Sequence, residues 1–195
     1  MGMPASKIAL IAIVVVVLGM VLLVIVTYNN FIGLDQNVQS KWSEVENQYQ
    51  RQADLIPNLV SVISSSVSVE TDFVKDVIAA RTNWAGAQTE YDKDKAGVEM
   101  NNGITAFVRA VAENYPVLKA NAQYVALTDE LSGSQNRITV ARGRYIESIQ
   151  HYNTAIKTFP GNVLAGMFGF SEKEYYNAQL NAMNTPSLGG GGLPA

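Results

Sequence analysis

Cysteine is absent from the 195-residue chain, and histidine occurs once, at His151. The lack of cysteine excludes disulfide bonds, thiolate nucleophiles and Cys/His zinc sites, and one histidine excludes any triad that needs a second. A chain without cysteine also suits an oxidising compartment, although it does not require one. We therefore expect no metal site and no cofactor.

Sequence motifs of catalysis are missing as well. The chain has no P-loop, no Gly-x-Ser-x-Gly and no His-Glu-x-x-His pattern. A di-iron centre in a helical bundle needs Glu-x-x-His on two helices, whereas Glu147 and His151 are four residues apart and no second histidine exists. We predict that the protein is not an enzyme and has no catalytic residues.

Positive charge is scarce. All 17 acidic residues and 13 of the 14 basic residues follow Val26, which gives the rest of the chain a formal net charge of −4 (13 − 17). This is the wrong sign for a surface that binds phosphates. Nucleic acid is therefore excluded as an expected partner.

One long apolar run is present at residues 8–26, with no charged residue in 19 positions. As a helix it spans about 28 Å, close to the hydrocarbon thickness of a bilayer. A cleaved signal peptide is the alternative, but the run is long for one, and residues 24–28 lack a small-x-small cleavage pattern. We predict a transmembrane helix that makes the lipid bilayer a partner, preceded by a short segment at 1–7.

The orientation depends on few charges. Lys7 precedes the run, and Lys41 is the only basic residue in the 20 positions after it. The amino terminus adds to the positive charge ahead of the run, and positive charge favours the cytoplasmic side. We predict an inner-membrane protein with the rest of the chain on the periplasmic side.

Helical periodicity governs residues 27–184. A first stripe with steps of three and four comprises Phe31, Leu34, Val38, Trp42, Val45, Tyr49, Ile56, Leu59 and Ile63. Pro57 lies inside this stripe, where it either kinks the helix or begins a new one capped by Asp54. A second, weaker stripe comprises Val74, Val77, Ile78 and Trp84 and ends near Gly86. Residues 88–97 are polar and predict a solvated connection.

Two further helices are expected. The third runs from Val98 to about Leu131 and is interrupted at Pro116, and a turn at 132–134 leads to the fourth, from Ile138 to Phe159. Without strand signals, these stripes predict an all-α antiparallel four-helix bundle. A short helix is expected from Ser171 to about residue 184, followed by a flexible glycine-rich tail at 185–195.

Candidate interaction residues follow from polarity and aromatic content. Residues 42–54 are rich in amides and acids, which suits either a surface that binds a peptide or small polar ligand or an ordinary solvent face. Arg142 follows the stripe residue Ala141, and Glu46 or Asp54 is its expected partner. The full set is Trp42, Glu46, Asn47, Asp54, Pro57, Asn58, Tyr115, Pro116, Arg142, Tyr152, Phe168 and Phe170.

An apolar group at residues 164–170, which includes Phe168 and Phe170, lies outside the four main stripes. Two readings are open. The group folds back over one end of the bundle, or it contacts another copy of the chain or the membrane surface, because contiguous exposed apolar patches mark contact sites. The second reading, together with tethering of parallel anchors in two dimensions, predicts a homo-oligomer.

Several segments resemble those of one family in their order and spacing. They are Tyr28–Phe31, Trp42–Arg51, Asp54–Val60, Glu113–Pro116, Leu118–Asn121, Gln135–Ile138, Ala141–Arg142 with Tyr145, and Tyr152–Asn153 before Phe159–Pro160. Together they are similar to the LemA family of bacterial membrane proteins, over residues 8 to 180. Gln135, where members commonly carry glutamate, and the serine-rich residues 64–68 depart from the pattern.

The resemblance implies one N-terminal membrane helix, a bundle of bromodomain-like topology and no catalytic residues. The expected function is a membrane-anchored interaction or scaffold protein of the cell envelope that self-associates and contacts other envelope proteins. The alternative is a membrane-tethered sensor or carrier that binds a small polar ligand or peptide between its helices.

Overall fold

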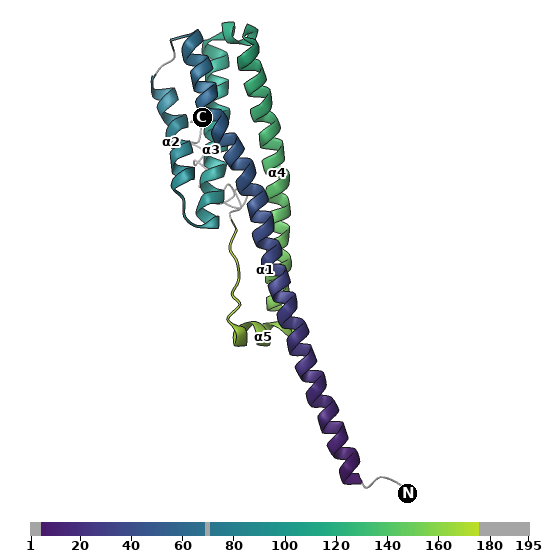
Figure 1. Cartoon of the computed structure of the whole chain (residues 1–195). Coiled ribbons are helices and arrows are strands. Elements are labelled where there is room, and N and C mark those ends of the chain that lie inside the picture. Colours follow the sequence, from purple (N-terminus) through teal and green to yellow (C-terminus); the bar gives the residue numbers. More distant parts are fainter. Residues whose placement is uncertain (1–4, 69–70, 176–195) are drawn as a thin grey trace, which may run out of the picture. The chain divides into compact units, whose positions relative to one another are not determined.

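The computed structural model describes residues 5–68 and 71–175. The elements in order are α1 (Ala5–Ser66), α2 (Thr71–Gly86), α3 (Glu90–Asn114), the 3-10 helix η1 (Pro116–Ala120), α4 (Ala122–Lys157) and α5 (Gly161–Phe168) (Figure 1). No strand occurs in these described ranges. The predicted all-α class is confirmed.

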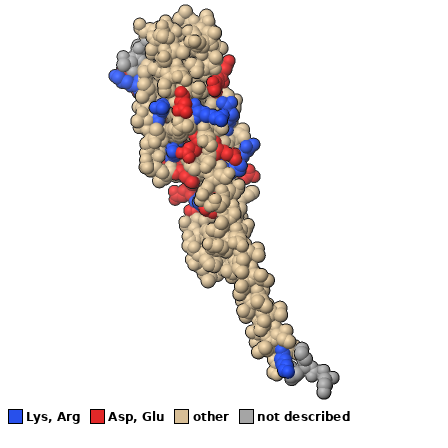
Figure 2. Space-filling view, in the orientation of Figure 1, with Lys and Arg blue, Asp and Glu red and all other residues tan. Residues whose placement is uncertain are grey.

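Helix α1 is continuous over 62 residues. Its first part contains the run 8–26, whose side chains are almost all exposed, and it is long and apolar enough to cross a membrane. On the face shown in Figure 2, this exposed part carries few coloured side chains. Pro57 does not break the helix, because α1 continues to Ser66 and the buried stripe resumes at Leu59 and Ile63.

The chain divides into two compact units. We call residues 1–43 with 142–173 the anchor unit, and residues 44–141 with 174–195 the body unit. Helices α1 and α4 contribute residues to both units.

The anchor unit packs α1 against α4 and α5. Trp42 of α1 and Tyr145 of α4 are both buried, and their ring centroids are 5.2 Å apart. Gly161 begins α5 at a very close approach, since a Cβ atom there would lie 2.2 Å from the Ala155 carbonyl oxygen and 3.1 Å from the Phe31 ring. Only glycine fits this position.

The body unit is formed by the second part of α1, by α2, α3 and η1, and by the first part of α4. Helices α2 and α3 lie side by side (Figure 1). The buried apolar side chains include Val45, Tyr49, Ile56, Leu59, Ile63, Val77, Trp84, Met100, Ile104, Phe107, Val111, Leu118, Tyr124, Leu131 and Ile138. The residues from Val45 to Trp84 in this list are stripe residues that the periodicity predicts, although Ile78 is 45% exposed.

The predicted solvated connection at residues 88–97 is wrong. Helix α3 already begins at Glu90, where Thr89 is the N-cap and its hydroxyl oxygen accepts the Asp92 N–H at 3.0 Å. Acidic residues stabilise the first turn of a helix, which explains the local charge. Asp94 and Gly97 face the core instead of solvent.

The predicted boundary between the third and fourth helices is also displaced. The chain turns at Pro116, and α4 runs without interruption through residues 132–134. Proline occupies the first turn of η1, where its missing N–H is not needed. The Asn121 side chain then caps α4 by accepting the N–H groups of Gln123 and Tyr124. Ser134 is fully buried in α4, so a small polar residue here serves packing rather than a turn.

The segment after α5 is not the helix expected from Ser171. Gly169 ends α5 with φ at 77°, and residues 170–175 are not helical. Their backbone bonds to α4 instead: Tyr152 donates to the Ser171 carbonyl, and the Asn153 side chain pairs with both backbone groups of Lys173. The remainder of the expected helix and the tail at 185–195 lie outside the described residues.

Candidate functional site

The core of the body unit contains a buried carboxyl group, Asp94 of α3, with 0% exposure. The Tyr49 hydroxyl of α1 donates to its Oδ1 at 3.3 Å. Gly97, one turn later in α3, leaves space for the tyrosine, because a Cβ atom at this position would lie 2.5 Å from the ring. The glycine and the tyrosine therefore define how closely α1 and α3 approach.

A buried amide lies one turn along α1 from Tyr49. Gln52 is 0% exposed, and its Nε2 donates to Asn101 Oδ1 of α3 at 2.9 Å. Its Oε1, like Gln48 Oε1 and Trp84 Nε1, has no hydrogen-bond partner among the described residues. A buried polar atom in this state costs about 1–3 kcal/mol, so these amides are not a simple means of stabilisation.

An ion pair completes the polar contacts. Lys93 of α3 pairs with Glu46 of α1, and its ammonium lies 5.5 Å from the Trp84 ring centroid of α2. Both charged side chains are partly buried, so the pair is screened less than an exposed one. We call Glu46, Tyr49, Gln52, Trp84, Lys93, Asp94 and Asn101 the polar cluster. It connects α1, α2 and α3 through the Tyr49–Asp94 and Gln52–Asn101 hydrogen bonds and the Lys93–Glu46 ion pair, although Gln52 Oε1 and Trp84 Nε1 have no partner among the described residues.

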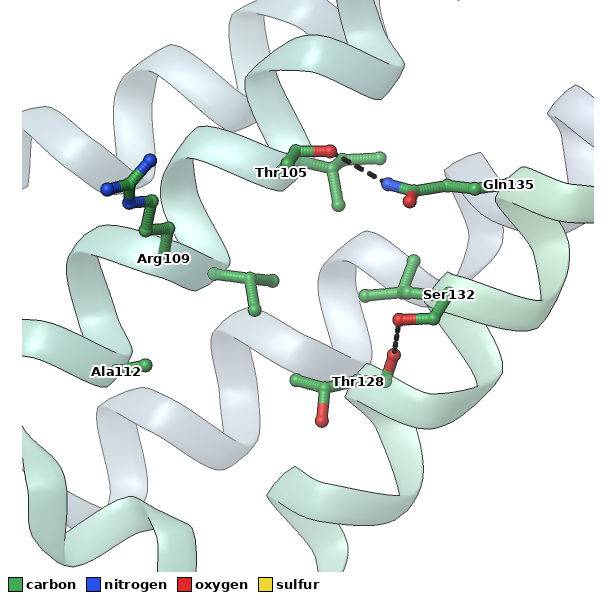
Figure 3. Close-up of a pocket in the computed structure, with 9 residues that line it drawn as sticks. Thr105, Arg109, Ala112, Thr128, Ser132 and Gln135 are labelled. Atoms are coloured by element: carbon green, nitrogen blue, oxygen red, sulfur yellow. Dashed lines mark hydrogen bonds between the residues drawn. The ribbon is translucent and has the colours of Figure 1, made fainter.

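A surface groove of about 240 Å³ lies between α3 and α4 (Figure 3). Ile104, Val108 and Leu131 supply apolar lining. The polar lining includes Thr105, whose hydroxyl accepts a hydrogen bond from Gln135 Nε2 at 2.8 Å across the groove. The remaining lining residues are Arg109, Ala112, Thr128 and Ser132. The groove thus offers an apolar surface with hydrogen-bonding groups at its edge.

The predicted interaction residues do not form one site. Glu46 belongs to the polar cluster, whereas Asn47, Asp54, Pro57 and Asn58 are exposed on α1. A buried pocket lined by all these side chains is therefore not formed. Exposure at these positions agrees with the reading of residues 42–54 as an ordinary solvent face, while Gln52 and Tyr49 within the same segment are core residues.

Glu46 and Asp54, the partners expected for Arg142, each make another contact. Glu46 pairs with Lys93, and Asp54 accepts a hydrogen bond from Gln50 at 2.8 Å. Arg142 itself is half-buried in the anchor unit and has an interaction of its own. A lower melting temperature for Arg142→Ala stays a prediction.

Tyr115 and Pro116 lie at the junction of α3 and η1. The Tyr115 hydroxyl donates to the Ser68 carbonyl at 2.9 Å, so this side chain holds the end of α1 beside the turn. Pro116 is exposed and sets the start of η1. Both residues have structural roles.

In the anchor unit, Tyr152 is buried on α4, and its hydroxyl donates to the Ser171 carbonyl at 3.0 Å. Burial raises the pKa of Tyr152 above 10, the nearby Lys173 ammonium lowers it, and the Asp35 carboxylate raises it. Lys173 and Asp35 form an ion pair at 2.8 Å.

Phe168 and Phe170 pack on the start of the buried stripe of α1. The Tyr28 ring centroid lies 5.0 Å from Phe168 and 5.8 Å from Phe170, and Phe31 lies 5.1 Å from Phe170. All three pairs are edge-to-face, the favoured arrangement of aromatic rings. The apolar segment therefore folds back onto α1, although Phe168 stays 43% exposed.

Sequence reasoning missed Asp94 and Gly97, because residues 88–97 look like a polar loop, and it gave no role to Asn101. A detectable signal was the spacing of Asp94, Gly97, Met100 and Ile104 at steps of three, three and four, which continues the stripe of α3 toward its N-terminus. In the ranges 5–68 and 71–175, no group of three Asp, Glu or His side chains could hold a metal ion.

Comparison with known proteins gives one family. A family model described as the LemA family matches residues 41–188. Magnetosome proteins MamQ 1 and MamQ 2 of Paramagnetospirillum magneticum are each 23% identical over 197 residues, covering 88% of this chain and 72% of the relative. Magnetosome protein MamQ of Magnetospirillum gryphiswaldense is 24% identical over 186 residues, covering 83% and 68%.

Proposed function

The chain belongs to the LemA family, and we propose that it is a single-pass membrane-anchored scaffold whose body unit contacts other proteins of the bacterial envelope. Membrane association itself is supported by the family and by the apolar first part of α1. We propose further that the protein is located in the inner membrane and that it self-associates. We also propose that its helices form an antiparallel four-helix bundle of bromodomain-like topology.

The observation that carries this proposal is the continuity of α1. One helix contains the exposed apolar run 8–26 and the buried stripe that ends at Ile63. A helix satisfies its own backbone hydrogen bonds in lipid, so α1 can leave the bilayer without a change of secondary structure. The apolar run and the buried stripe of the body unit therefore belong to one continuous helix.

The groove between α3 and α4 is the contact surface that we propose for envelope partners. It combines apolar lining with the hydrogen-bonding groups of Thr105 and Gln135 (Figure 3). Protein interfaces have this composition, with an apolar centre and a polar rim.

In-cell photocrosslinking tests the contact surface. A photoreactive amino acid at Ser132, an exposed groove residue, should give discrete adducts after detergent extraction, which mass spectrometry identifies. The matched control is Ser61, an exposed serine of α1 that does not line the groove. Equal adduct patterns at both positions, or no adduct at either, contradict the proposed surface.

The membrane orientation is tested with protease. With Lys7 ahead of the run and little positive charge behind it, the body should be outside the cytoplasm. Protease added to intact spheroplasts should then digest the body while cytoplasmic control proteins survive. Complete protection of the body reverses the assignment.

Self-association is tested by light scattering coupled to size exclusion. Parallel anchors raise the local concentration of the bodies, so weak contacts become populated. We expect a homo-oligomer of the full-length chain in mild detergent. A monomer across several detergents and protein concentrations refutes this part of the proposal and leaves the anchor unaffected.

The same groove favours a second candidate, a membrane-tethered protein that binds a small polar ligand or peptide. The groove has a volume of about 240 Å³, and Thr105 and Gln135 supply polar groups that face each other across it. A ligand that binds the folded state raises its melting temperature with concentration. A compound screen by thermal shift should find hits that Thr105→Val with Gln135→Leu abolishes, and the absence of such hits rejects the candidate.

A further inference from the structure

The anchor unit has a second apolar surface outside the run 8–26. Phe159, in the connection before α5, is 84% exposed, and Val163 and Met167 of α5 are 55% and 72% exposed. The other side of α5 is occupied, because Leu164 and Ala165 are buried. An eight-residue helix that is apolar on both sides is not suited to a surface in water.

This surface lies beside the residues that directly follow the apolar run. The Phe168 ring packs on Tyr28, and Phe159 and Val26 line the same surface hollow. Tyr28 and Phe31 are two and five residues beyond Val26, which places them about 3 and 7.5 Å farther along the helix axis. The headgroup layer on each side of the hydrocarbon core is about 5–8 Å thick. Helix α5 is therefore level with the headgroups when residues 8–26 span the bilayer.

Charge is excluded from the same level of the unit. Neither residues 8–34 nor residues 158–170 contain a charged side chain. Charged residues flank both uncharged segments and pair with each other: Asp35 pairs with Lys173 at 2.8 Å, and Lys157 pairs with Glu172 at 2.5 Å. An uncharged aromatic layer followed by a charged layer is the arrangement found at the edge of a bilayer, where Trp and Tyr gather and charges remain in water.

We infer that α5 is an interfacial helix, with Phe159, Val163 and Met167 inserted at the boundary between the headgroups and the acyl chains. Amphipathic helices that bind a lipid surface bury their apolar side to about this depth. The inference rests on the proposed membrane anchor. The surface continues the apolar surface of the run, so the bilayer that receives the run also reaches α5, which favours lipid over a second copy of the chain as its occupant.

Because the chain has no cysteine, single-cysteine variants give unambiguous labelling sites. We would attach a nitroxide spin label at Val163→Cys in the full-length protein in phosphatidylcholine and phosphatidylglycerol vesicles. The control is Val140→Cys in the body unit, because Val140 and Val163 have the same 55% exposure. The ratio of collision with lipid-soluble oxygen to collision with a water-soluble nickel chelate measures depth. We expect this ratio to be at least about threefold higher at position 163.

A third label at Leu18→Cys separates this inference from the anchor on which it rests. If the oxygen to nickel ratio is high at 18 and at 163, α5 lies in the lipid surface. If it is high at 18 and equal at 163 and 140, the anchor stands and the inference is wrong. If position 163 is shielded from both reagents and shows spin–spin broadening, a second copy covers α5 and the inference is wrong. A low ratio at 18 overturns the anchor itself.

Discussion

The two ends of α1 are both helical, yet the same residue type is exposed at one end and buried at the other. Leu18 in the apolar run is 57% exposed, whereas Leu59 in the body unit is 0% exposed. Every position of the run is uncharged, whereas the second part also contains charged and polar residues and buries its large apolar side chains at every third or fourth position. A helix surrounded by lipid must be apolar on all sides, and one that packs on a protein core needs only a stripe. The surroundings, and not the helix, determine the composition.

The largest effect is expected when Leu59 and Leu18 are each replaced by alanine. Leu59→Ala removes buried side-chain volume and should lower the free energy of unfolding by about 2–5 kcal/mol. Leu18→Ala removes the same atoms from an exposed position and should change it by less than about 1 kcal/mol. Far-UV circular dichroism of the full-length protein in mild detergent during chemical denaturation measures both. Equal losses would show that residues 8–26 pack on protein.

Arginine at position 18 tests whether the apolar run lies in lipid. A charged side chain at the centre of a membrane helix costs about 3 kcal/mol by insertion measurements. Leu18→Arg should therefore be extracted from the membrane fraction more readily than Leu18→Phe, although the remaining apolar residues still favour insertion. Alkaline carbonate extraction measures the distribution. Greater extraction of Leu18→Phe than of Leu18→Arg would show that position 18 is not surrounded by lipid.

The sequence predicts the apolar end of α1 and its stripe well, because both signals are strong and local. Periodicity identifies Phe31, Val38, Val45 and Ile63, all of which are buried. It leaves the effect of Pro57 open, because the proline penalty competes with packing on both sides of that position, which sequence alone does not report.

The sequence predicts α3 and the polar cluster poorly. Asp94 sits in a charged segment, and its burial depends on Tyr49, which lies 45 residues earlier in the chain. A buried carboxyl group becomes visible only when its partner is known. The boundary at 132–134 failed for a related reason: serine and glycine suggest a turn, but at Ser134 a small residue fills a tight position in α4.

Replacing two glycines of α3 by alanine tests how tightly the helices of the body unit pack. At Gly97 it would meet the Tyr49 ring at 2.5 Å, so Gly97→Ala should destabilise the protein by about 1–3 kcal/mol through overpacking. At Gly103 it would meet only Ala80 Cβ at 3.6 Å, so Gly103→Ala should be neutral or stabilising by up to about 1 kcal/mol. The melting temperature of Gly97→Ala should thus fall, while that of Gly103→Ala should stay unchanged or rise. A harmless Gly97→Ala would mean that α1 and α3 are farther apart than described.

The smallest effect concerns Tyr152, which lies near Asp35, the first charged residue after the apolar run. Tyr152 is buried and donates to the Ser171 carbonyl, and burial raises its pKa above 10. Below pH 10 the hydroxyl keeps its proton in the folded and unfolded states, so its contribution to stability is constant. As the pH rises above 10, the unfolded chain loses the proton first, and stability falls until the folded pKa is passed.

Tyr152→Phe lacks this titration. We expect the variant to be less stable than the parent by about 0.5–1.5 kcal/mol at neutral pH, because one hydrogen bond is lost. The difference should shrink above pH 10, since only the parent then pays for keeping a proton on this side chain. Melting temperatures of both proteins from pH 7 to 11.5 measure the difference, and the other tyrosines cancel because both proteins contain them. A difference that stays constant, or grows with pH, would show that the Tyr152 hydroxyl is accessible to water and that burial does not raise its pKa.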